Sequence, residues 1–500
     1  MRAVITDNRW VYFDAITPET EDLFYNHFSA KHGRARYIDT NAGWDGYYRR
    51  YDLKKQRIAR TFLDDVIKLC ADRSIPLDIV DKRTLSRFPA NVAAIRADIL
   101  RGITLEDHQL KAIEAASKNE TGIINFVTGG GKTEVAAGII KLYNCPTVVI
   151  ADIRVVIEQI YDRIEARDVT PGVGIFYGGR MPSGQPVVVG SIQSLNSPPL
   201  TMLKTKPGEY AIRAKRSKLF QDIVAKCELL IVDECDKTSG DHYKPLFNKY
   251  FTGRYRYGLS GTPFDPDKPV ANLFVKEYFG SIISGADRQA MQSIGRIIPI
   301  KHMAIAFGED GDPKEKSAYD IAEREQIVDN PEFHKRVAKI VESFPDDGTL
   351  VIVDTNNVEA LGFALEATIP NSKFIYGKTS KSVRKQYIKE FEERKIKCLI
   401  GGKILKRGLD LKGGVENLIV CGGGKLQSNF DQIIGRAVRN NKRGWARVFS
   451  FFYLNNSYLY AHSRKQLKTI IDMEYDSKII FKNGIMDSAA FVKSKFRRPK

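Results

Sequence analysis

Apolar runs rich in β-branched residues alternate with amphipathic stretches from about residue 100 onward. Segments such as KTEVAAGIIKLY (132–143) lie between the runs and have the pattern of surface helices. Parallel strands need crossover connections, so this alternation predicts a parallel sheet covered by helices on both faces. The first series of expected strands consists of GIINFV (122–127), PTVVIADI (146–153), PVVVGSI (186–192), ELLIVD (228–233) and RYGLSGT (256–262).

The alternation lapses once and then resumes. Residues 307–330 are charged and poor in apolar side chains, which predicts a partly helical connector. The second series of expected strands consists of TLVIVDT (349–355), SKFIYG (372–377), IKCLIGG (396–402), VENLIVCGG (415–423) and ARVFSFFYL (446–454). The chain therefore contains two α/β units in series, which repeat an architecture and not a sequence.

We predict an α/β fold with two parallel-sheet domains in tandem, over residues 96–306 and 331–458. A smaller α+β domain, residues 1–95, precedes them. Residues 459–500 are predicted to form a basic C-terminal extension, mobile at its tip. A chain of 500 residues has room for about three domains.

The composition is that of an ordinary soluble protein, 43% hydrophobic and 28% charged. No apolar run reaches the roughly 18 residues of a transmembrane helix, and the first residues lack the apolar core of a secretory signal. The six cysteines are scattered without a CxxC pair, which predicts reduced, mostly buried thiols. We therefore expect a cytoplasmic protein that does not bind membranes.

The formal net charge is +18. Clustered lysines and arginines gain affinity for phosphate backbones by releasing counterions, so nucleic acid is the first partner we expect. Charge alone does not distinguish DNA from RNA or from an acidic protein, and a solvated basic surface without a partner is the alternative. No segment indicates a particular protein partner.

A glycine-rich stretch, TGGGKT (128–133), follows the first expected strand and opens a helix. Gly129, Gly130 and Gly131 lack Cβ atoms, so the backbone can bring its N–H groups against phosphate oxygens. Lys132 is then placed to reach the β and γ phosphates, and Thr133 to bind Mg²⁺. The strict pattern GxxxxGK[ST] is not met, because Phe126 occupies its first glycine position. A tight surface turn is the alternative interpretation.

Two other segments carry chemistry. In DECD (233–236), Asp233 directly follows an apolar strand and is placed to hold Mg²⁺, while Glu234 is placed to orient or deprotonate a water. In QIIGRAVR (432–439), Arg436 and Arg439 lie on one helix face. Arginines supplied by a neighbouring domain stabilise phosphoryl transfer by about 10³–10⁵ in rate. The alternatives are a solvated acidic turn and an exposed basic helix.

In chain order, TGGGKT, DECD, SGTP (260–263) and QIIGRAVR resemble motifs I, II, III and VI of superfamily 2 helicases. LEDHQLKAI, IADIRVVIEQ, VVVGSIQSL and ILKRGLDLK (404–412) resemble further motifs of that superfamily. The resemblance implies two RecA-like domains, ATP and Mg²⁺ as cofactors, and a nucleic-acid-dependent ATPase.

The resemblance also implies a role for each matched residue. It assigns adenine recognition to Gln109; nucleotide contacts to Thr128, Gly408 and Asp410; catalysis to Lys132, Asp233, Glu234, Gln432, Arg436 and Arg439; nucleic-acid backbone contacts to Ser191, Gln193, Ser194 and Thr379; and coupling of the two sites to Ser260 and Thr262. One departure is Asp236, which stands where the DEAH group has histidine.

Within this superfamily the sequence is similar to phage UvsW-type helicases, which act on branched DNA. Those helicases also carry a small N-terminal domain with a turn similar to Ala42-Gly43-Trp44-Asp45-Gly46. The similarity implies a helicase that acts on forks, junctions or D-loops in recombination, replication or repair, in the cytoplasm of a bacterial host if the chain is phage-encoded. A duplex translocase that does not separate strands and an RNA-remodelling ATPase are the alternatives.

The turn around Trp44 suggests how branched DNA would be read. Trp44 and Tyr47 are placed to stack or wedge at a fork, and nearby arginines to contact phosphates. Those arginines are Arg34, Arg36, Arg49 and Arg50. A packed tryptophan with a solvated basic rim is the alternative. A scaffold with an inactive nucleotide site is disfavoured, because the sequence fills each catalytic role.

Overall fold

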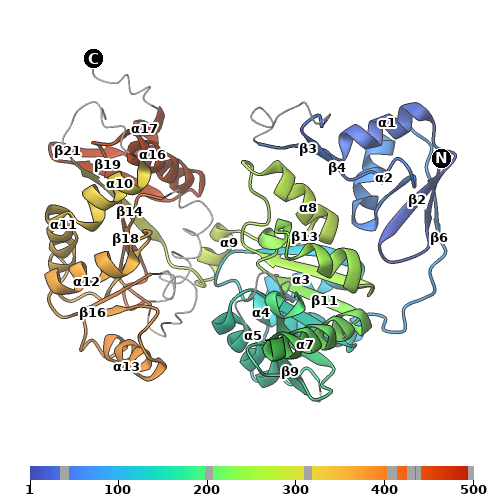
Figure 1. Ribbon diagram of the computed structural model, residues 1–500, viewed down its shortest axis with the longest axis horizontal. Helices are drawn as coiled ribbons and strands as arrows, with labels where there is room; N and C mark the ends of the chain where they lie inside the picture. The colour runs from blue at the N-terminus through green and yellow to red at the C-terminus, as the bar shows by residue number, and fades with distance from the viewer. Residues whose placement is uncertain are drawn as a thin grey trace. The chain divides into compact units, whose positions relative to one another are not determined.

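The computed structural model describes residues 1–33, 44–170, 172–196, 207–308, 318–402, 414–424 and 441–493, with Leu411 and Ile434 (Figure 1). The chain divides into two compact units. Residues 1–127 and 131–287 form the first unit, and residues 128–130 and 288–500 form the second. Within the described parts of both units, no helix has the length and apolar character needed to cross a membrane.

The N-terminal domain is a small α+β fold, as predicted. Its sheet has the strand order β5-β2-β1-β6, with β1 antiparallel to β2 and parallel to β6. Phe13 and Phe24 pack edge to face in its core, with ring centroids 5.2 Å apart. Its elements are β1 (Arg2–Ile5), β2 (Trp10–Asp14), α1 (Pro18–His27), β3 (Ser29–Lys31), β4 (Tyr47–Arg49), β5 (Arg57–Ala59), α2 (Leu63–Asp72) and β6 (Asp78–Asp81).

The first α/β domain contains a seven-stranded parallel sheet of order β13-β7-β12-β11-β8-β10-β9. Its strands are β7 (Thr121–Phe126), β8 (Thr147–Ala151), β9 (Val173–Phe176), β10 (Val187–Ser191), β11 (Leu229–Asp233), β12 (Tyr255–Ser260) and β13 (Ile282–Ala286). Its longer helices are α3 (Asp107–Lys118), α4 (Lys132–Tyr143), α5 (Arg154–Ala166), α7 (Pro207–Lys226) and α8 (Pro269–Phe279). The five predicted strands are present. The sequence analysis missed β9, a short strand between glycines, and β13, which forms an edge with little burial.

The second α/β domain contains an eight-stranded sheet of order β16-β17-β15-β18-β19-β14-β20-β21. The five predicted strands are present here too. Its described strands are β14 (Ile300–Phe307), β15 (Thr349–Val353), β16 (Ser372–Ile375), β17 (Cys398–Gly401), β18 (Asn417–Cys421), β19 (Ala446–Tyr453), β20 (Asp476–Phe481) and β21 (Gly484–Asp487). Helices α11 (Pro331–Glu342), α12 (Val358–Thr368), α13 (Lys381–Glu392) and α16 (Ser457–Asp472) flank it. The tandem arrangement of two parallel-sheet domains is confirmed.

Two predicted boundaries of this domain need correction. Strand β14 pairs with β19 and β20, so residues 300–306 belong to the second sheet and not to the first domain. The predicted C-terminal extension is folded through Lys493, because α16 and the β20–β21 hairpin complete the same sheet and a small hydrophobic core. The tip, residues 494–500, lies outside the described residues.

Charged groups fasten the N-terminal domain to the first α/β domain. Arg60 and Arg83 of the N-terminal domain lie 3.0 and 2.9 Å from the carboxylate of Glu120, and Arg254 lies 2.6 Å from it. Burial alone would raise the pKa of Glu120, but attraction from these arginines outweighs it and lowers the pKa. The carboxylate therefore stays charged and joins two arginines of one domain to one of the other.

A second contact joins the same two domains. Arg50 pairs with Glu277, a buried residue of α8, and the Thr61 hydroxyl donates to the backbone oxygen of Glu277 at 2.6 Å. Arg256 is buried close by, where desolvation lowers its pKa to about 9 against the attraction of Glu277. Arg50, which was predicted to contact phosphates, is therefore committed to this domain contact.

Candidate nucleotide and nucleic-acid site

The glycine-rich stretch forms a turn between β7 and α4. Gly129 and Gly131 have positive φ values of 95° and 82°, a region that only glycine adopts readily. Gly131 is also the residue that precedes the first turn of α4, so free backbone N–H groups at this helix end are available to an anion. Phe126 is fully buried and its ring lies 5.1 Å from that of His108. The residue that breaks the strict motif is therefore a core residue that ends the strand before the turn begins.

Gln109 lies directly against this turn. Its side-chain oxygen accepts a hydrogen bond from the Glu106 backbone N–H at 3.0 Å, which caps α3, and only 4% of the residue is exposed. A Cβ on Gly131 would lie 2.0 Å from the Gln109 Nε2 atom. The third glycine is therefore needed for backbone conformation and for space, and the predicted adenine-reading amide is fixed beside the glycine-rich turn.

Lys132 and the acidic motif meet at the carboxyl ends of the strands. The Lys132 Nζ atom lies 3.4 Å from the Phe126 backbone oxygen and 4.0 Å from the Glu234 carboxylate. Asp233 is the last residue of β11, and Glu234 adopts a left-handed conformation with φ of 53°. Such backbone strain is common at functional sites. The predicted phosphate-binding lysine and the two predicted catalytic acids are therefore brought together.

The electrostatics of Asp233 suit a cation. Burial, together with repulsion from Glu234, raises the pKa of Asp233 to about 6, against the attraction of Lys132 and Lys237. A carboxylate and the hydroxyl of Thr133, which lies in the first turn of α4, are oxygen donors of the type that Mg²⁺ prefers. The residues present fit the metal. Asp233 and Thr133 would hold it, and the ion would supply charge neutralisation of phosphate oxygens.

We expect the Mg²⁺ concentration needed for half-maximal ATPase activity to rise about tenfold per pH unit as pH falls below the Asp233 pKa of about 6, because proton and cation compete for one carboxylate. Without a cation, the raised pKa means that this group's contribution to stability is lost as pH rises through about 6. Magnesium titrations of ATPase activity between pH 5 and 8 would measure the change in the Mg²⁺ concentration needed for half-maximal activity. An unchanged requirement across that range would contradict the assignment of Asp233.

Two contacts, one of Asp236 and one of Asp152, were not predicted from the sequence, and that of Asp236 connects two motifs. Asp236 accepts a hydrogen bond from the Ser260 hydroxyl at 2.8 Å, and the Ser260 oxygen accepts one from the Thr262 backbone N–H at 3.1 Å. Tyr243 donates to Asp152, which follows β8, at 2.7 Å. The acidic motif is thereby linked to Ser260 and Thr262, the two residues predicted to couple nucleotide and nucleic acid.

The predicted backbone-binding residues of the first domain lie at the start of the short helix α6 (Ile192–Leu195). Ser191 caps this helix by accepting from the Gln193 backbone N–H at 3.2 Å, and only 8% of it is exposed. Ser194 and Gln193 line a cavity of about 170 Å³. In the second domain, the Thr379 hydroxyl accepts from the Tyr376 backbone N–H at 3.1 Å in the loop before α13.

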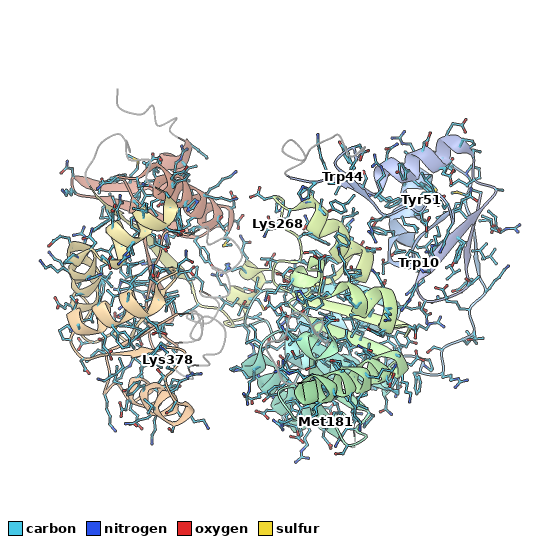
Figure 2. The ribbon with its side chains drawn as sticks, in the orientation of Figure 1. Trp10, Trp44, Tyr51, Met181, Lys268 and Lys378 are labelled. Carbon is cyan, nitrogen blue, oxygen red and sulfur yellow. The ribbon has the colours of Figure 1, made fainter. Side chains whose placement is uncertain are left out.

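The β3–β4 pair carries a cluster of aromatic side chains, and Figure 2 shows Trp44 at this end of the N-terminal domain. The Trp44 and Tyr48 rings meet edge to face at 5.4 Å, and Tyr47 and Tyr48 are 38% and 37% exposed. Arg49 donates to Asp45 at 2.9 Å, and its guanidinium lies 4.5 Å from the Tyr25 ring centroid. The two tyrosines are therefore accessible and Trp44 is half-buried, whereas Arg49 already has a carboxylate partner.

Several predicted residues lie outside the described residues. They are Arg34, Arg36, Gly408, Asp410, Gln432, Arg436 and Arg439. Their assignments stay predictions.

Comparison with known proteins supports the motif assignments. The family model of the type III restriction enzyme, res subunit, matches residues 102–265. The family model of the helicase conserved C-terminal domain matches residues 334–441. Together the two matches include the glycine-rich turn, the acidic motif and the distant arginines. The chain belongs to the superfamily 2 helicases, which are nucleic-acid-dependent ATPases, and these domains bind ATP.

Individual relatives are distant. DNA 3'-5' translocase XPB2 of Sulfurisphaera tokodaii is 22% identical over 380 residues, which cover 68% of this chain and 80% of the translocase. The crystal structure of T4 UvsW aligns with 96% of this chain and 98% of its own, at 15% identity and a TM-score of 0.42. A structure of the UvsW helicase from bacteriophage T4 aligns with 56% of this chain and 98% of its own, at 17% identity and a TM-score of 0.44.

Proposed function

We propose that this helicase uses ATP to remodel branched DNA, such as forks, junctions or D-loops, in recombination, replication or repair. The observation that carries the proposal is the aromatic cluster of Trp44, Tyr47 and Tyr48, in which both tyrosines are exposed and Trp44 is half-buried. Aromatic rings stack on unpaired bases of any sequence, and unpaired or splayed bases occur where a duplex branches. The cluster packs against the first α/β domain, where the Tyr48 and Phe274 ring centroids are 6.2 Å apart.

The remaining parts of the proposal follow the family chemistry. Lys132 and the glycine-rich turn hold the ATP phosphates, Asp233 and Thr133 hold Mg²⁺, and Glu234 orients the attacking water. Arg436 and Arg439, with Gln432, stabilise charge on the transferred phosphoryl group. The net charge of +18 favours association with a polyanion. Free, buried cysteines suit the reducing cytoplasm of a bacterial host.

ATPase and unwinding assays on a panel of nucleic acids test this function. We expect forks, junctions and D-loops to stimulate hydrolysis and to be unwound more than plain duplex or RNA. Displacement of a triplex strand without separation of the duplex would favour a duplex translocase. Stimulation by RNA above DNA would favour an RNA-remodelling ATPase.

Replacing Tyr47 with alanine is expected to weaken binding of a three-way junction by about 1–3 kcal/mol, the range for one base stacked on an aromatic ring. Binding of a plain duplex of equal length should change little. The matched control is Tyr458→Ala in α16, which removes a 50% exposed tyrosine from the other unit. Fluorescence anisotropy measures both affinities. Equal junction binding by the two variants would remove the aromatic cluster from substrate recognition.

A further inference from the structure

The cavity beside Ser194 has a lining that suits an anion. Its walls come from the end of β9, from α6 and from α7, and its volume is about 170 Å³. Side chains of Gln193, Ser194 and Asn196 contribute polar groups, and Arg213 and Arg216 contribute positive charge. Among the residues that the structure describes, none that lines the cavity carries a carboxylate. The cavity therefore combines two guanidinium groups with neutral hydrogen-bonding groups.

The packing of α7 places both arginines at the cavity. Ser217, Phe220 and Val224 are the buried face of the helix, and Phe220 stacks on Phe176 with ring centroids 4.6 Å apart. Arg213 lies one helical turn before Ser217 on the same face of α7, and Arg216 directly precedes Ser217 in the chain. The stacked rings therefore fix α7 against the end of β9, and the Ser194 hydroxyl donates to the Phe176 backbone oxygen at 3.4 Å, so the arginines and Ser194 are both positioned against the end of β9.

Neither guanidinium has a carboxylate partner among the described residues. The Nε atom of Arg216 is buried without a hydrogen-bond acceptor. A buried donor left unpaired costs about 1–3 kcal/mol, so an acceptor that entered the cavity would recover free energy. The arginine fork matches the geometry of phosphate oxygens. Gly178 on the opposite wall has open space where a Cβ would point, which leaves room for a group to enter.

We propose that Arg213 and Arg216 form, with Gln193 and Ser194, a binding site for a phosphodiester of the bound strand. The helix that carries both arginines lies outside the helicase motifs, so this is a contact that the motif set does not assign. The inference rests on the proposed function, because it takes the anion to be a nucleic-acid phosphate. The proposed site gives α7 a role in binding the nucleic-acid strand to the first α/β domain.

The double variant Arg213→Gln/Arg216→Gln tests the site. Each lost phosphate contact on a single strand lowers the salt slope of binding by about 0.7, so we expect a fall of about 1.4 and a dissociation constant raised about tenfold or more. ATPase activity without nucleic acid should be unchanged. The probe is a fluorescent single-stranded oligonucleotide, titrated by anisotropy across a series of salt concentrations.

The control is Lys215→Gln/Lys218→Gln, which removes the same charge from exposed positions of the same helix, where Lys218 pairs with Asp222 at 2.9 Å. Equal slopes for the two double variants would overturn the phosphodiester site, while nucleic-acid-stimulated hydrolysis would still support the proposed function. If nucleic acid did not stimulate ATP hydrolysis by the unmodified chain, the proposed function itself would be refuted. Thermal unfolding of each variant shows whether α7 stays folded.

Discussion

Lys132→Ala is expected to lower ATP turnover by at least about 10²–10³-fold, the range for removing one preorganised group that stabilises transition-state charge. The Lys132 ammonium lies at the start of α4, 3.4 Å from the Phe126 backbone oxygen and 4.0 Å from the Glu234 carboxylate. It is thus placed to reach a phosphate held in the glycine-rich turn. Nucleic-acid binding should survive, because the residues proposed to contact the strand lie on other elements.

Lys141→Ala is the matched control for that variant. Lys141 lies in the last turn of the same helix, where its Nζ atom donates to the Asp168 backbone oxygen at 2.9 Å. Steady-state phosphate release measures turnover, and anisotropy with labelled DNA measures binding. If Lys132→Ala hydrolysed ATP as fast as Lys141→Ala, the glycine-rich turn would not be the phosphate-binding site.

The second large effect is expected at Glu120. Glu120→Ala should lower the free energy of unfolding by about 3–5 kcal/mol, because it leaves the buried Arg60 and its neighbour Arg254 without their ion-pair partner, while Arg83 keeps only Asp81. The lowered pKa of Glu120 gives the pH dependence its sign. Its stabilisation is present above the ordinary glutamate pKa and is lost as pH falls through the folded-state value.

Urea unfolding of Glu120→Ala beside Glu114→Ala measures this effect. Glu114 is an exposed residue of α3 that pairs with Lys118 at 2.9 Å, and a surface pair of this kind contributes about 0–1 kcal/mol. Glu120→Gln keeps the shape of the side chain and removes its charge, so it separates electrostatics from packing. Similar free energies for all three variants and the unmodified chain would mean that the arginine cluster does not stabilise the domain contact.

Local sequence was sufficient to predict ten strands of the two α/β sheets. Runs such as ELLIVD form strands because four consecutive apolar residues can be buried on both faces of a parallel sheet, as those of β11 are. Strand β14, by contrast, could not be assigned to a sheet from local sequence. Its sequence, IKHMAIAF, is compatible with a strand of either sheet, and only its pairing with β19 and β20 assigns it to the second domain.

The interface of the N-terminal domain was beyond sequence reasoning. No local feature of the sequence separates Arg50, Arg60 and Arg83 from solvated arginines. Arg50 was predicted to contact nucleic-acid phosphates. Their partners Glu120 and Glu277 come from distant elements of the first α/β domain. Ion pairs between distant segments depend on which surfaces meet, and that is decided by packing of the whole unit.

The sequence by itself predicted the nucleotide site, because a phosphate-binding turn requires glycine conformations, a lysine and a following helix within one short segment. It also determined the tandem α/β architecture through the spacing of apolar runs. Only the tertiary structure decided that Gln109 fills the space a Gly131 side chain would need, that Asp236 binds Ser260, and that Arg213 and Arg216 reach the cavity beside Ser194. Each of these contacts joins residues from different elements, so its geometry exists only once the sheet and its helices have packed together.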